Sequence, residues 1–131
     1  MTPSLDQIRK RLVGQVGSHC GAHPHPYAPD RITQTPCVFV GSLTRRKASM
    51  DGAVDLEGKL YFFARAGGDQ HLAELDDAVL GDTSMAEAID ADPTLGLDGV
   101  LVTYDEAGDY GLHEWAGGPY WGVMIDLTIL L

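Results

Sequence analysis

Residues 120–131 read YWGVMIDLTILL, and this stretch decides the fold that we expect. Every second position from Trp121 to Leu131 is apolar, whereas the positions between them are mixed. Side chains of a strand alternate between two faces, so the pattern predicts one strand with a wholly buried face. An edge strand this apolar would aggregate, so we place it inside a sheet. Asp126 and Thr128 then lie on the second face, which meets water or the polar surface of another subunit.

Length and charge limit the class of protein. The 131 residues predict a single domain, 1–131, and a hydrophobic content of 44% is enough for a core. The net charge of -10 argues against a nucleic-acid binder. All 9 Lys and Arg lie at or before Arg65 with 5 acidic residues, giving 9 − 5 = +4; the remainder holds 19 − 5 = 14 acidic residues and no base. The acidic half has three possible roles. It forms a solvated surface, a surface that orients a partner, or the wall of a passage that does not hold DNA.

Periodicity and capping signals predict an α+β domain. Ser4 and Gln7 are spaced as a capping box, and Gly17 supplies a helix stop. We expect a mixed, mainly antiparallel sheet of about four strands with helices packed on one face, and an oligomer that buries the remaining apolar surface. The expected elements are a helix 4–16, a loop 17–36, a short strand 37–40, a polar loop 41–52, a long strand 53–66, helices 69–80 and 84–89, a strand 99–104, a polar turn 105–111, a return arm 112–115 and the strand 120–131.

The predicted loop 17–36 contains His19, Cys20, His23 and His25, which are metal-ligand types at short spacing. No second ligand pair follows at a finger-like distance, and prolines after His23 and His25 hold the chain extended. We therefore expect no native metal and no cofactor. No nucleophile elbow, zinc-protease helix or phosphate loop is present, so we expect a protein that is not an enzyme. A small metal-dependent hydrolase is the enzymatic alternative.

The densest positive charge is formed by Arg45, Arg46 and Lys47. This segment is either a solvated loop or a finger that reaches the acidic surface of a partner. No apolar stretch could span a bilayer and no secretory signal is visible, so we expect a protein made in a reducing cytoplasm without a membrane partner.

The order and spacing of these elements are similar to those of the tail terminator proteins of long-tailed, siphovirus-type bacteriophages, over nearly the whole chain. The likeness begins with an amphipathic helix that carries basic residues, a proline-bearing loop and a strand. The residues that carry it are Arg9-Lys10-Arg11, Thr35-Pro36-Cys37-Val38-Phe39-Val40, Leu60-Tyr61-Phe62-Phe63-Ala64, Gly68-Asp69-Gln70 with Leu72, Leu75 and Leu80, Ser84-Met85-Ala86-Glu87-Ala88-Ile89, and Tyr120-Trp121-Gly122-Val123.

The resemblance implies a virion protein, assembled in the host cytoplasm, that forms a homohexameric ring on the head-proximal end of the tail tube. Such a ring stops tube polymerisation and offers a docking face to the head-completion or connector protein, while DNA passes through the lumen without specific binding. The family has no catalytic residues. Our hypothesis places Arg45, Arg46 and Lys47 at the tail tube, and Asp126 and Thr128 at the lumen or at a subunit contact.

Two further interpretations differ in where the protein would be found. Another head–tail joining or completion ring would sit on the portal side of the joint. A free cytoplasmic α+β binding module would be a stable monomer with a ligand pocket.

Overall fold

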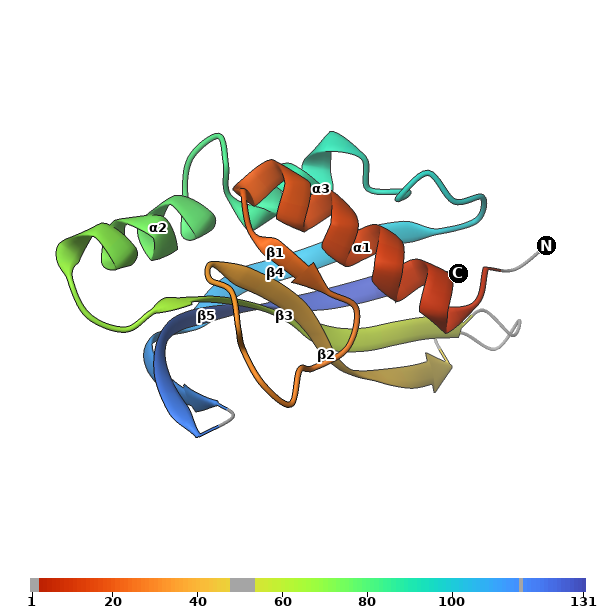
Figure 1. The fold of residues 1–131 in the computed structure, drawn as a ribbon. Coiled ribbons are helices and arrows are strands. Elements are labelled where there is room, and N and C mark those ends of the chain that lie inside the picture. The colour runs from red at the N-terminus through yellow and green to blue at the C-terminus, as the bar shows by residue number, and fades with distance from the viewer. Residues whose placement is uncertain (1–2, 48–53, 116) are drawn as a thin grey trace.

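The computed structural model describes residues 3–47, 54–115 and 117–131, without the side chains of Lys47, Val54 and Glu106. These residues form a mixed sheet of five strands, in the order β1-β2-β3-β5-β4, and three helices (Figure 1). The elements are α1 Leu5–Cys20, β1 His23–His25, β2 Cys37–Lys47, β3 Val54–Arg65, α2 Asp69–Val79, α3 Met85–Ala91, β4 Leu101–Trp115 and β5 Gly118–Leu130.

The expected α+β class and the mixed sheet are confirmed, and the sheet has five strands instead of about four. The additional strand is β1, which pairs in parallel with β2 and lies inside the segment that we expected to be a loop. The other neighbouring strands are antiparallel.

Strand β5 lies inside the sheet, as its sequence predicts. It pairs with β3 along an unbroken register from Arg65↔Tyr120 to Asp55↔Leu130, and with β4 on its other side. Val123, Ile125, Leu127 and Ile129 of β5 point into the main core, each no more than 3% exposed. The apolar half of the alternating pattern therefore faces the helices, as expected.

Helix α1 begins as the sequence predicts but ends later. The Ser4 hydroxyl accepts a hydrogen bond from the Gln7 N–H, and the Gln7 side chain accepts one from the Ser4 N–H, which completes the capping box. The predicted stop at Gly17 is wrong, because the helix continues to Cys20 and ends at Gly21, whose φ is 69°. Gly17 is buried instead, and a Cβ there would lie 2.8 Å from the Ala22 carbonyl oxygen.

The predicted polar loop after Val40 is wrong in its first part, because β2 continues to Lys47. The added residues pair with β3, so Arg45 lies opposite Leu56 and Arg46 opposite Asp55. A bulge between Val40 and Leu43 separates the apolar and polar parts of the strand. Cross-strand pairing thus overrides the weak strand propensity of this segment. The rest of the predicted loop, residues 48–53, lies outside the described residues.

The polar turn predicted at 105–111 is also wrong. Strand β4 runs through it, with register shifts between Tyr104 and Ala107 and between Gly108 and Gly111. These bulges absorb one extra residue each against β5, and Asp109 takes a φ of 51° in the second. Polar residues and glycines therefore mark bulges here and not the end of the strand.

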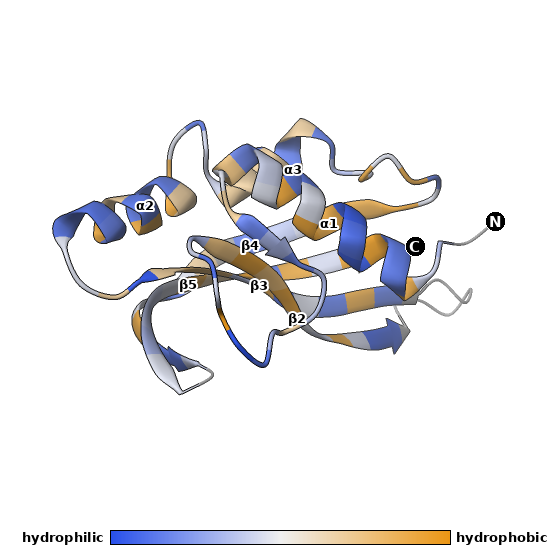
Figure 2. Cartoon of the chain, in the orientation of Figure 1, coloured by the Kyte–Doolittle hydropathy of each residue, from blue (hydrophilic) through white to orange (hydrophobic). Residues whose placement is uncertain are grey.

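The two shorter helices are close to prediction. Helix α2 begins at Asp69, but its N-cap is Gly68, which makes no side-chain capping bond. Ser84 caps α3 by accepting a hydrogen bond from the Glu87 N–H at 3.2 Å. Figure 2 shows apolar residues concentrated along the central strands, while polar and apolar residues alternate along α1 and α2. All three helices contribute to the main core on one side of the sheet, as expected.

We predict that Gly122→Ala destabilises the protein by about 1–3 kcal/mol, because a Cβ at this position would lie 2.6 Å from the Phe63 ring and 2.8 Å from the His113 ring. Gly14→Ala is the matched control, since Gly14 lies in α1 with nothing within 4 Å of an added Cβ. It should stabilise the protein by about 0.5–1 kcal/mol. Urea unfolding of the three proteins measures both changes, and equal midpoints for Gly122→Ala and the unchanged protein would contradict the close packing at Gly122.

Candidate interaction surface

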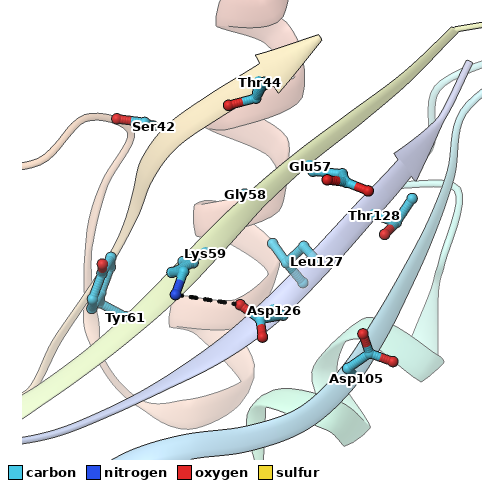
Figure 3. A pocket seen from close by; sticks show the side chains of 10 residues that line it. All are labelled: Ser42, Thr44, Glu57, Gly58, Lys59, Tyr61, Asp105, Asp126, Leu127 and Thr128. Atoms are coloured by element: carbon cyan, nitrogen blue, oxygen red, sulfur yellow. Dashed lines mark ion pairs between the residues drawn. The ribbon is translucent and has the colours of Figure 1, made fainter. Parts of the chain in front are cut away.

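The side of the sheet opposite the helices carries a polar surface at one end. We call this side the open face. Alternation along β3 and β5 places Glu57 and Lys59 on the open face, directly opposite Thr128 and Asp126. These side chains line a shallow hollow of about 610 Å³ (Figure 3). The complete lining consists of Ser42, Thr44, Glu57, Gly58, Lys59, Tyr61, Asp105, Asp126, Leu127 and Thr128.

Two ion pairs cross neighbouring strands on the open face. The Lys59 Nζ lies 3.8 Å from the Asp126 Oδ1 (Figure 3), and the Arg46 Nη1 donates to the Glu57 Oε1 at 2.5 Å. All four side chains are at least 44% exposed, so water screens each pair, which stabilises the fold by about 0–1 kcal/mol. Exposed carboxylates and cations of this kind are groups that a charged partner surface can contact.

The other end of the open face is apolar and covered. Phe39 lies between the rings of Tyr61, Phe63 and Trp115, at centroid distances of 5.0, 5.4 and 5.0 Å. The Trp115 indole N–H donates to the Pro29 carbonyl oxygen at 3.0 Å, which ties the segment between β1 and β2 over these rings. The segment between β1 and β2 therefore covers these rings, whereas the hollow at the polar end is open to solvent.

A buried thiol belongs to the aromatic end. Cys37 is fully buried, and burial raises its pKa to about 11. The thiol is thus protonated and shielded near neutral pH, which makes Cys37 a packing residue.

The histidine-bearing segment does not converge on a common point. The His19 Nε2 lies 2.6 Å from the Asp82 carbonyl oxygen, so this nitrogen donates to a neighbouring loop. The rings of His23 and His25 meet edge to face at 4.9 Å. Residues 3–47, 54–115 and 117–131 contain no group of three or more His, Cys, Asp or Glu side chains arranged to hold a metal ion.

The structure separates the residues that we predicted to contact partners. Asp126 and Thr128 come together on the open face, and Arg46 joins them there through its pair with Glu57. Arg45 lies opposite the core residue Leu56, so it projects on the helix side of the sheet.

Lys47 ends β2, and its side chain lies outside the described residues. The predicted basic finger is thus the end of a strand whose two arginines point to opposite sides of the sheet.

Sequence reasoning did not select three charged residues of the surface, Glu57, Lys59 and Asp105. The first two share the alternation of β3 that the sequence shows, so pairing β3 with β5 would have placed them beside Asp126. Asp105 gave no such signal, because it lies in a bulge that was predicted to be a turn.

The chain matches no protein-family model and no curated protein sequence. Within the part of the chain that the structure describes, no helix has both the length and the apolar character needed to cross a membrane.

We predict that the free energy of unfolding decreases as the pH falls through the ordinary histidine range, and that His25 contributes to this decrease. Burial, and secondarily the neighbouring His23, lower the pKa of His25 in the folded protein. As pH falls through 6.5, the unfolded chain takes up this proton more readily than the folded chain, so the free energy of unfolding decreases. In urea unfolding between pH 7.5 and pH 5.5, His25→Gln should show a smaller decrease. An identical decrease in both proteins would exclude this role for His25.

Proposed function

We propose that this protein is a structural component of a phage virion, a homohexameric ring on the head-proximal end of the tail tube. The ring stops tube polymerisation, forms the joint to the head-completion complex and lets DNA pass through its centre. This proposal combines the resemblance in element order with the surface described above.

The observation that carries the proposal is the uncovered polar end of the open face. Helices cover the opposite side of the sheet, whereas Glu57, Asp105 and Asp126 project from the open face into solvent. If subunits turn this face inward, the passage through the ring is lined with carboxylates. Carboxylates repel the phosphates of a moving DNA molecule and so do not retain it. Lys59 and Arg46 do not reverse this sign, because they pair with Asp126 and Glu57, and these five side chains have a net charge of 2 − 3 = −1.

The end of β2 is the proposed contact with the tail tube. The Arg46 side chain is 65% exposed although it pairs with Glu57, and Lys47 follows it at the end of the strand. Two adjacent cations at the end of this strand suit an acidic rim on the tube.

We predict that Arg46→Glu/Lys47→Glu forms rings of unchanged mass but caps tubes poorly. The reversed charges would oppose an acidic rim at the tube contact without entering the sheet core. The test is an assembly reaction of the cognate tube protein with the ring protein, in which tube lengths are measured by electron microscopy. The native protein should give short tubes of uniform length, and the double variant should give longer ones.

Lys10→Glu/Arg11→Glu is the control, because it makes the same change of net charge on exposed positions of α1. It should cap as the native protein does. If the native protein has no effect on tube length and localises to the portal side of virions, it is another head–tail joining ring. A monomer without affinity for tubes would instead favour the free binding module.

A further inference from the structure

The sheet has two partly uncovered edges, a basic one at β2 and an acidic one at β4. On the β2 side, β1 pairs only with Cys37–Phe39, and the Arg9 Nη1 donates to the Val40 carbonyl oxygen at 3.2 Å. Beyond this point, no described strand pairs with the outer edge of β2 at residues 41–47. An edge strand offers unpaired N–H and C=O groups to another strand.

The opposite edge of the sheet is β4. The Val102 N–H donates to the Pro93 carbonyl oxygen at 2.7 Å, so a loop covers the beginning of this edge. From Thr103 onward, no strand in residues 3–47, 54–115 and 117–131 pairs with the outer side of β4. Both edges therefore have a covered part and a part that is available to another chain.

The two available edges lie at the same level of the sheet. Thr44 pairs with Glu57, Glu57 with Thr128, and Thr128 with Thr103, so one row crosses all four strands and joins the two available parts. Each neighbouring pair in β2-β3-β5-β4 is antiparallel, so β2 and β4 run in opposite directions. A β2 strand from a second copy would therefore meet β4 as an antiparallel partner, with its helices on the same side.

The charges of the two edges are complementary on the helix side. Arg45 is exposed there, beside the core residue Leu56. Two acidic residues lie next to β4: the exposed Asp98 in the turn before the strand, and Asp90 of α3, which accepts a hydrogen bond from the Tyr104 hydroxyl at 2.7 Å. In an antiparallel extension at this level, Arg45 lies beside Val102, where the covered part of β4 ends and which follows Asp98 by four residues. Residues 41–44 then meet the available part of β4, and Arg46 and Lys47 extend past it.

We propose that β2 of one copy pairs with β4 of the next, so that the sheets of successive copies form one continuous antiparallel sheet. Every copy offers both edges, so the copies join head to tail. The series closes into a ring when the rotation between successive copies is a whole fraction of a full turn. The contact between copies is inferred from the two edges alone. Only the closure into a ring of six rests on the proposed function. It also removes the exposed edges that would otherwise aggregate.

The test reverses one charge on each edge. Arg45→Glu and Asp98→Arg should each weaken self-association by about ten-fold or more, because each places two like charges across the contact. The variant carrying both substitutions should associate as the native protein does, since every contact then has one charge of each sign. An equimolar mixture of the two single variants should also associate, in alternating order. Native mass spectrometry and sedimentation over a range of concentrations measure these outcomes.

Arg31→Glu and Asp30→Arg are matched controls in an exposed segment over the aromatic end of the sheet, and they should leave association unchanged. The edge contact would be overturned if neither single edge substitution weakened self-association. It would also be overturned if self-association were not restored in the combined variant. A native protein that stays monomeric alone and on tube ends would overturn it too. A ring that responds as expected but leaves tube length unchanged would reject the proposed function and retain the contact.

Discussion

The antiparallel pairing of β5 with β3 is the constraint on which the rest of the structure depends. Their register is continuous from Arg65↔Tyr120 to Asp55↔Leu130, without a bulge. Because side chains alternate strictly, this register decides which residues of both strands face the helices, and a slip by one residue would turn every apolar side chain of β5 away from the core. It also brings Lys59 beside Asp126 and Phe63 beside Gly122. The core and the open face are therefore two consequences of one pairing.

The same register divides the open face into two environments. At one end, Gly122 leaves room for the Phe63 ring, around which Tyr120, Trp115 and Phe39 gather. At the other end, residues of the same strands and parity are charged or hydroxylated, so they remain in water. The aromatic end holds the segment between β1 and β2 in place, whereas the hollow at the polar end is open to solvent. Side chains at the polar end are half-exposed and weakly paired.

The sequence predicts the elements whose periodicity is strong and misses those that depend on a partner. Strand β5, the long β3 and the cap of α1 at Ser4 follow from local patterns, because alternation, helical spacing and capping need no distant contact. The end of β2 has no apolar pattern of its own and becomes a strand because β3 lies beside it. The bulges of β4 contain the polar residues and glycines that usually mark turns. For the surface, Asp126 and Thr128 could be placed on one face by parity, but their neighbours Lys59 and Asp105 required the pairing of distant strands.

Charge is segregated in space because it is segregated along the chain. The first half of the chain, which holds every Lys and Arg, supplies α1, β1, β2 and β3, and the second half supplies α2, α3, β4 and β5. Since the sheet order is β1-β2-β3-β5-β4, the boundary between the halves falls between β3 and β5, and each half keeps its own side of the sheet. A sheet polarised across its strands is attracted to other copies from edge to opposite edge and repelled from like edge to like edge. Symmetric pairing of two like edges is thereby disfavoured relative to the proposed head-to-tail contact, and a series built on that contact stops growing only when it closes on itself.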